Sequence, residues 1–213
     1  MFFFSIYTIK ERLWRYGLDM TINVTINDTR QEMQREIAVC RELFEKKTRD
    51  YGTSWRILRL PSLTDQIFIK ASRIRSIQES GENHVGDGVR GEFVAMVNYA
   101  VMALMQQELL EGQEGEQKEV PLELPLEETM ALYDRHLKQT IDLMLNKNHD
   151  YGEAWRQMRV SSMVDLILMK LRRIKQIEDH EGQTLVSEGV EGGYMDIINY
   201  SLFCLVRMSE EEA

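Results

Sequence analysis

The sequence predicts an all-α protein in which two tandem three-helix repeats pack as one pseudo-twofold helical bundle. The first observation is a duplication: residues 47–56 (KTRDYGTSWR) return as residues 147–156 (KNHDYGEAWR), and fourteen of the thirty-one positions from 47 to 77 are identical in both copies. The second is the helical spacing of apolar residues, with almost no strand signal. The third is length, because modules of about 85 residues approach the lower limit for an independent core and are expected to pack together.

The first helix of repeat 1 is expected to open at a capping box formed by Asp28 and Gln31. Its counterpart in repeat 2 is expected to span residues 126–147. Gly52 and Gly152 follow these helices and suit the left-handed residue that stops a helix.

The second helix of each repeat is expected to begin at a capping pattern. This pattern is Ser62-x-x-Asp65 in repeat 1 and Ser162-x-x-Asp165 in repeat 2. The helix of repeat 1 is then expected to reach about Gln78, and that of repeat 2 the matching position.

The third helices are expected to begin near Val89 and Val190. They are apolar on nearly every side, as an element at the centre of a bundle should be. We therefore expect a six-helix assembly with these two helices in the middle.

The remaining segments are expected to lie outside the repeats. The segment between the copies is acidic and contains Pro121 and Pro125, which is typical of a solvated linker. The apolar start is too short to span a bilayer, and its charges follow the apolar run, whereas those of a secretory signal precede it. The expected division is an N-terminal extension (1–26), repeat 1 (27–110), an acidic linker (111–126), repeat 2 (127–208) and an acidic tail (209–213).

Composition argues against several classes of function. A net charge of -9 argues against binding to a nucleic acid duplex, which relies on phosphate neutralisation. Cys40 and Cys204 lack metal-ligand spacing and are expected to be free thiols in a reducing cytosol, so we expect a cytoplasmic protein without a membrane partner. The four histidines form no zinc pattern, and no P-loop or GxSxG sequence is present.

Two repeated lysines carry the main functional signal. Lys70 and Lys170 fall within the apolar stripe of the second helix of their repeats. A desolvated ammonium needs a partner, so each lysine is expected either to pair with a carboxylate of a neighbouring helix or to bind a ligand phosphate. Arg73 and Arg173 lie one turn further on, which is the spacing of a phosphate clamp. Both alternatives stay open.

The acidic candidates differ between the repeats. In repeat 2, Glu188, Asp196 and Asn199 project from one side of the expected third helix. In repeat 1, Ala95 takes the place of Asp196, so the central acid is missing there. The asparagine of that helix is retained in repeat 1 as Asn98, and both asparagines need either an interhelical hydrogen bond or a ligand.

Other repeated residues cluster around the end of the first helix. Asp50 and Asp150 oppose the helix dipole there, which predicts a fixed role, either in locking the turn or in facing a site. The remaining repeated candidates are Tyr51, Trp55, Tyr151 and Trp155.

The combined motifs resemble a known family. The string K-x-x-D-Y-G-x-x-W, followed by S-x-x-D-x-I-x-x-K-x-x-R-I and an acid-G-V segment leading to N-Y, resembles the nucleotide modification associated domain 1 family, a domain of unknown function. The resemblance covers residues 27–107 and 127–207. Through its D-x-x-N-Y helix that family is similar to MazG-like all-α nucleotide pyrophosphohydrolases, which bind magnesium with helical carboxylates and act on nucleoside triphosphates.

The resemblance implies a MazG-like bundle with a magnesium-nucleotide site. Glu188, Asp196 and Asn199 match its acidic helix, and Asp165, Lys170 and Arg173 would face them from the second helix, so the metal candidates are Glu188, Asp196 and Asp165. Lys170 and Arg173 are the phosphate-binding candidates of this site, and Lys70 and Arg73 are those of repeat 1 by their helical position. The sequence departs from the family at positions 91 and 192, where glycine replaces an acid. This departure argues against hydrolysis through two well-held metal ions, although one or two carboxylates can hold magnesium when substrate phosphates complete its shell.

We therefore expect a protein that binds a nucleotide or a related phosphorylated small molecule, with magnesium as the cofactor. Magnesium-dependent pyrophosphohydrolysis of a nucleotide is the reaction to test. The alternative is a non-catalytic structural or protein-interaction module in which lysine–carboxylate pairs are internal. The sequence does not determine the base, the pathway or the oligomeric state, and it leaves a homo-oligomer open.

Overall fold

The computed structural model describes residues 18–83, 86, 88–111, 121–151, 153–180, 182 and 189–212, and these residues include no strand. Side chains are described from Thr29 onward, except in the gaps and at residues 147–151 and 212. The long helices are α2 (Leu18–Tyr51), α3 (Leu60–Ser80), α4 (Val89–Glu111), α5 (Leu126–Tyr151), α6 (Val160–Asp179) and α7 (Glu191–Glu212). Two short 3-10 helices, η1 (Ser54–Ile57) and η2 (Ala154–Gln157), follow α2 and α5.

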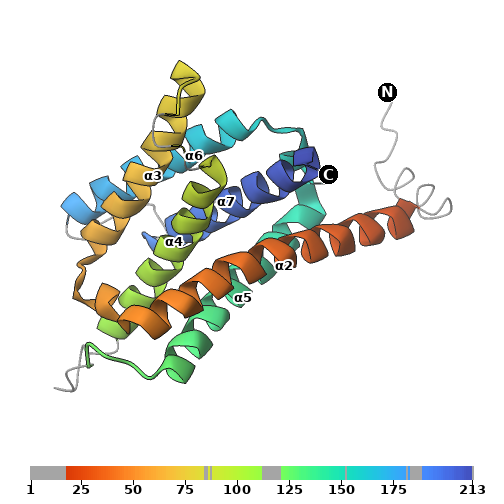
Figure 1. Cartoon of the computed structure of the whole chain (residues 1–213). Helices are drawn as coiled ribbons and strands as arrows, with labels where there is room; N and C mark the ends of the chain where they lie inside the picture. The colour runs from red at the N-terminus through yellow and green to blue at the C-terminus, as the bar shows by residue number, and fades with distance from the viewer. Residues whose placement is uncertain are drawn as a thin grey trace, which may run out of the picture.

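Each helix packs against its counterpart from the other repeat. The pairs α2–α5, α3–α6 and α4–α7 are all in contact. Figure 1 shows α4 and α7 in the middle, with the α3–α6 pair on one side and the α2–α5 pair on the other. The prediction of an all-α bundle with the third helices at its centre is confirmed.

Reciprocal contacts between α3 and α6 reveal the pseudo-twofold axis. Lys175 Nζ lies 2.5 Å from Asp65 Oδ1, and Arg75 Nη2 lies 3.2 Å from Asp165 Oδ1. Positions 65 and 165 are equivalent in the two repeats, as are positions 75 and 175. A contact that recurs with its two partners exchanged between the copies is the mark of a twofold interface.

The apolar residues of the central helix α4 are buried inside the fold. It is the one helix among the described residues that is long and apolar enough to cross a membrane, and 67% of the qualifying stretch is buried inside the fold. It contacts α2, α3, α5 and α7, so that nearly all its faces are covered by protein. Its buried residues include Phe93, Met96, Val97, Val101 and Leu104.

The predicted start of the first helix is wrong. Helix α2 begins at Leu18, so Asp28 and Gln31 lie inside it rather than in its first turn, and the predicted boundary at residue 27 falls within the helix. Residues 18–51 contain no glycine or proline. Because no backbone breaker separates the predicted extension from the repeat, the helix continues through both.

The capping serines predicted for the second helices are also wrong. Helices α3 and α6 begin two residues before Ser62 and Ser162, and their N-caps are Arg59 and Arg159 without a side-chain capping bond. In α3 the first turn contains Pro61, whose fixed φ suits that position. The two aspartates of the expected capping pattern instead make the α3–α6 ion pairs described above.

The expected helix stop at Gly52 is confirmed. Gly52 has a φ of 61°, and its N–H donates to Thr48 O at 2.9 Å. A Cβ at this position would also collide with the carboxylate of Glu123. The matching Gly152 lies outside the described residues, and Glu153 takes a left-handed φ of 57° there.

Part of the predicted solvated linker is anchored to repeat 1. Thr53 Oγ1 donates to Leu122 O at 2.6 Å and accepts from Leu124 N–H at 3.0 Å. The Glu123 carboxylate accepts from Thr53 N–H at 3.2 Å. Residues 121–125 therefore pass directly over the end of α2 before α5 begins.

Candidate functional site

In repeat 1 the Lys–Arg clamp holds an internal carboxylate. Lys70 Nζ lies 3.1 Å from Glu92 Oε2, and Arg73 Nη1 lies 2.5 Å from Glu92 Oε1. A further nitrogen of Arg73 donates to Asn83 Oδ1 at 3.1 Å. Glu92, in the first turn of α4, is only 8% exposed. Lys70 and Arg73 therefore satisfy a buried acid, which is the structural alternative that their positions left open.

Sequence reasoning missed Glu92 because no acid occupies its place in repeat 2. With the register of 101 residues that relates the third helices, Glu92 corresponds to Gly193. The available signal was an acid inside an otherwise apolar run, since a buried carboxylate of that kind needs a cationic partner. Repeat 1 thus has an acid one turn before Ala95, whereas repeat 2 has Asp196 at the position that matches Ala95.

In repeat 2 the lysine pairs with the acid that repeat 1 lacks. Lys170 Nζ lies 2.6 Å from Asp196 Oδ2, and the two side chains are 21% and 31% exposed. Arg173 is exposed one turn further along α6. Tyr200 stands one turn after Asp196, and its pKa is raised by burial and by the nearby carboxylate. The pair therefore lies at the α6–α7 surface, within reach of solvent.

The two repeated asparagines have different surroundings. Asn98 Nδ2 donates to Cys40 O at 3.1 Å, and Asn98 Oδ1 accepts from the Tyr133 hydroxyl at 2.6 Å. The position that corresponds to Tyr133 in repeat 1 is Met33, which cannot donate. Asn199 Oδ1 is buried and has no hydrogen-bond partner among the described residues. An unpaired buried acceptor carries a desolvation cost of about 1–3 kcal/mol, which a water molecule, an ion or a ligand donor would offset.

Asp196 and Asn199 are the residues of the predicted magnesium site that the structure describes on α7, and they lie one turn apart. Both present oxygen atoms from neighbouring turns of α7, and oxygen ligands are what magnesium prefers. Glu188 lies outside the described residues, and Asp165 is paired with Arg75 at the α3–α6 interface. Among the described residues, no three His, Cys, Asp or Glu side chains converge on a metal position. The remaining ligands would have to be phosphate oxygens and water.

The repeated D-Y-G-x-x-W motif borders a cavity in repeat 1. The cavity has a volume of about 260 Å³ and lies between the end of α2, η1 and α4. Its lining residues are Phe44, Lys47, Thr48, Tyr51, Gly52, Ser54, Trp55, Ile57, Leu58, Tyr99 and Met102. Asp50 is exposed beside it and does not line it, and the side chains of Asp150 and Tyr151 lie outside the described residues. We call this space the Trp55 cavity.

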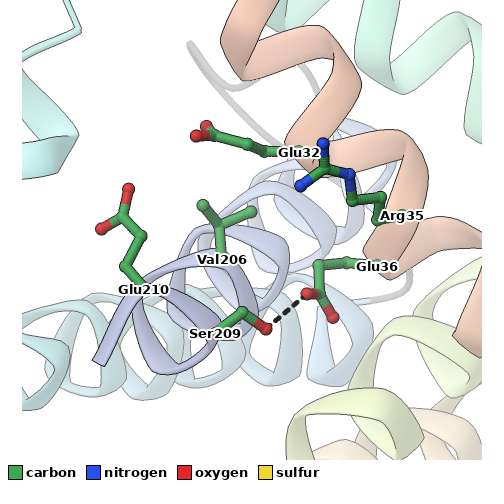
Figure 2. A pocket seen from close by; sticks show the side chains of 6 residues that line it. All are labelled: Glu32, Arg35, Glu36, Val206, Ser209 and Glu210. Carbon is green, nitrogen blue, oxygen red and sulfur yellow. Dashed lines mark hydrogen bonds between the residues drawn. The ribbon is translucent and has the colours of Figure 1, made fainter. Parts of the chain in front are cut away.

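A second cavity, of about 180 Å³, lies between α2 and α7 (Figure 2). Its walls are Glu32, Arg35 and Glu36 from α2 and Val206, Ser209 and Glu210 from α7. Glu36 accepts from the Ser209 hydroxyl at 2.8 Å and from Arg90, whereas Glu32 and Glu210 both pair with Arg156. The carboxylates around this space are thus already neutralised by arginines of the protein.

Arg156 pairs with two of the glutamates that line the second cavity, and it was not predicted as a site residue from the sequence. Its guanidinium contacts three glutamates at 2.5–2.7 Å: Glu32, Glu153 and Glu210. It also lies 4.5 Å from the ring centroid of Trp155. The repetition of arginine at positions 56 and 156 was the available signal. These contacts join α2, η2 and α7.

Both cysteines are buried in the core. Cys40 and Cys204 are fully buried free thiols, and burial raises the pKa of each to about 12. A thiol of such high pKa carries almost no thiolate at neutral pH and is a poor nucleophile or metal ligand. The expectation that both thiols are structural agrees with their burial.

Comparison with known proteins identified one family. The model of Nucleotide modification associated domain 1 matches residues 47–107 and again residues 147–208, which together make up more than half of the chain. No curated protein and no solved structure matched the chain. The two matches fall on the two structural repeats, each from the end of its first helix through its third. The chain therefore belongs to the nucleotide modification associated domain 1 family and contains two copies of that domain.

Proposed function

We propose that the protein binds a nucleotide or a related phosphorylated small molecule together with magnesium, at the α6–α7 face of repeat 2. The observation that carries this proposal is the contrast between the repeated asparagines. Asn98 bonds to Cys40 O of repeat 1 and to the Tyr133 hydroxyl of repeat 2, whereas the buried Oδ1 of Asn199 has no partner among the described residues and stands one turn from Asp196. Family membership supports it only in general terms, through the association with nucleotide modification.

Each residue of this proposed site has a distinct role. Asp196 and Asn199 hold magnesium, and Lys170 exchanges its contact with Asp196 for a phosphate oxygen when the ligand enters. Arg173 adds a second positive charge one turn away on α6. Magnesium held there would neutralise phosphate charge and would polarise a phosphoanhydride. The reaction to test is the release of pyrophosphate from a nucleoside triphosphate.

A non-catalytic structural module is the second candidate, and a specific observation favours it. Both repeated lysines lie in ion pairs with carboxylates of the same repeat, Lys70 with Glu92 and Lys170 with Asp196. In this alternative the pairs only align the second and third helices of each repeat. The two candidates differ in what removal of the lysine charge does to ligand binding.

The deciding experiment is calorimetry of nucleoside mono-, di- and triphosphates with and without magnesium. We expect magnesium-dependent binding of at least one of them to the unmutated protein. Asp196→Asn and Lys170→Met should each weaken that binding by about tenfold or more, because each removes a charge-assisted contact of about 1.5–3 kcal/mol. Circular dichroism establishes that the variants are folded.

Lys70→Met provides the matched control in repeat 1. Its charge is neutralised by an internal carboxylate in a repeat without the orphaned asparagine, so nucleotide affinity should stay within about twofold of the unmutated protein. Absence of binding at about 1 mM nucleotide, or an equal loss in Lys70→Met and Lys170→Met, would support the structural module instead.

A further inference from the structure

The Trp55 cavity has features that its packing does not explain. Trp55 is only 9% exposed, and its indole N–H, like that of Trp155 in repeat 2, has no hydrogen-bond partner among the described residues. Two large side chains at its edge are unusually exposed, Tyr51 at 67% and Ile57 at 75%. Buried Trp N–H groups usually find an acceptor, and exposed apolar side chains around a hollow mark binding surfaces.

Repeat 2 shows how the matching tryptophan is covered. The ring of Phe203 stacks on Trp155, with centroids 4.4 Å apart and 10° between the ring planes. Phe203 corresponds to Met102, with the same register of 101 residues that pairs Asn98 with Asn199. Met102 and Trp55 both line the cavity of repeat 1. In repeat 2 an aromatic ring of the third helix covers the tryptophan. In repeat 1 the equivalent position has the flexible thioether of Met102, next to an open space.

We propose that the Trp55 cavity is a binding site for a nucleoside 5′-monophosphate, whose base stacks on Trp55 as Phe203 stacks on Trp155. The stacked pair of repeat 2 provides the precedent for a flat ring on this tryptophan. The indole N–H lies in the plane of the ring, so a base stacked on the face of Trp55 leaves this N–H for a sugar oxygen beside the base. Lys47, exposed at the edge of the cavity, attracts the phosphate.

The size and the lining of the cavity restrict the ligand. A volume of about 260 Å³ lies just below the range of about 300–1,000 Å³ for drug-sized ligands, which suits a base and its sugar rather than a dinucleotide. The walls are mostly aromatic and aliphatic, and the few polar groups are the Ser54 hydroxyl and the Thr48 hydroxyl, which donates to Phe44 O at 2.9 Å and can only accept from a ligand. A phosphate outside the cavity, near Lys47, remains solvated and needs no metal ion.

The test introduces the phenylalanine of repeat 2 at the equivalent position of repeat 1. In Met102→Phe the new ring should occupy the face of Trp55, so the affinity for adenosine 5′-monophosphate should fall by about tenfold or more, the range for loss of one base–aromatic stack. Met102→Leu keeps an aliphatic side chain and should leave the affinity within about twofold. Calorimetry without magnesium and quenching of tryptophan fluorescence report binding, and circular dichroism reports folding.

A second variant separates the base from the phosphate. Lys47→Met should weaken binding of adenosine 5′-monophosphate about threefold to fivefold, the range for an exposed charge pair, and should leave binding of adenosine unchanged. Inorganic phosphate alone should not compete with adenosine. This variant keeps the proposal testable if Met102→Phe does not fold, because Lys47 is exposed and has no role in the core.

Several outcomes would overturn the proposal. These are absence of binding of adenosine and its monophosphate at about 1 mM, full affinity in a folded Met102→Phe, or equal effects of Lys47→Met on both ligands. Asp196→Asn should leave magnesium-free binding of the monophosphate intact, and Met102→Phe should leave magnesium-dependent binding in repeat 2 intact. Failure of this inference is therefore distinguishable from failure of the proposed function.

Discussion

A single residue type has different roles in the two repeats, depending on what faces it. Asn98 joins α2 and α5 by binding the Cys40 carbonyl and the Tyr133 hydroxyl. Asn199 faces a repeat in which Met33 stands at the position equivalent to Tyr133, and its carbonyl oxygen has no described partner. Retention of a residue in both copies therefore does not imply a shared function, because the partner lies on another helix and can change independently.

The Tyr133 hydroxyl provides a prediction at this scale. Tyr133→Phe should lower the free energy of unfolding by about 1–3 kcal/mol, because Asn98 Oδ1 is then buried without a donor. The stack of this ring on Phe44, with centroids 4.4 Å apart, should persist in the variant. Urea denaturation measures the change, and Tyr99→Phe on the partly exposed side of α4 serves as the control. A loss below about 0.5 kcal/mol would show that this hydrogen bond contributes little.

At the scale of elements, a polar cluster joins α3, α6 and α7. The Thr64 hydroxyl contacts Glu178 Oε1 and the Tyr194 hydroxyl, both at 2.7 Å, and the Tyr194 hydroxyl donates to Glu178 at 3.2 Å. The equivalent positions hold Val164, Gln78 and Phe93, so the other side of the pseudo-twofold axis is packed without this cluster. Burial raises the pKa of Glu178 more than the hydrogen bonds from Thr64 and Tyr194 lower it, and the charge of Asp65 raises it further.

The raised pKa of Glu178 predicts a pH-dependent contribution to stability. The folded protein binds the proton of Glu178 more tightly than the unfolded chain does. In the unfolded chain the pKa of this carboxyl has its ordinary value of 4.5. Its stabilising contribution is therefore present below about pH 4.5 and is lost as the pH rises through the folded pKa. Glu178→Gln should remove this dependence. The unfolding free energy of the variant minus that of the unmutated protein should therefore increase as the pH rises from about 4.5 through the folded pKa of Glu178.

Denaturation of both proteins at several pH values measures this difference. Glu79→Gln changes an exposed carboxylate near the end of α3 and is the matched control. A constant difference between Glu178→Gln and the unmutated protein across the window would show that Glu178 titrates alike in the folded and unfolded states.

At the scale of the whole molecule, the core belongs to both repeats together. Helices α4 and α7 contact each other as well as the second helix of their own repeat, and α3 contacts α6. Buried residues of all six long helices form one continuous hydrophobic cluster. Separating the repeats would expose the inner faces of α4 and α7 to water, and a fragment of about 90 residues has little other core to offset that exposure.

We therefore predict that neither repeat folds alone. A fragment containing residues 121–213 should lack a cooperative thermal transition, whereas the full chain should unfold in one transition. Mixing this fragment with residues 18–111 should restore helicity, which circular dichroism can measure at several concentrations. Cooperative unfolding of the isolated fragment at the melting temperature of the full chain would contradict a shared core.

Local sequence was sufficient for the features that depend on periodicity. The duplication and helical spacing predicted the all-α class, the central third helices and the stop at Gly52, and the structure confirms each. The predicted start at Asp28 failed because no breaker interrupts α2 before it, and the predicted start at Ser62 was two residues late because Pro61 already occupies the first turn of α3.

The sequence by itself determined that Lys70 and Lys170 lie on buried-facing stripes and that each needs an anion, because helical periodicity and the cost of desolvating a charge are local properties. Only the tertiary structure decided that Glu92 neutralises the first lysine and Asp196 the second. The partner of a side chain on one helix is set by the packing of another helix, and the sequence separation between them does not encode that packing. The same reason explains why the Trp55 cavity, formed by α2, η1 and α4 together, emerged only in three dimensions.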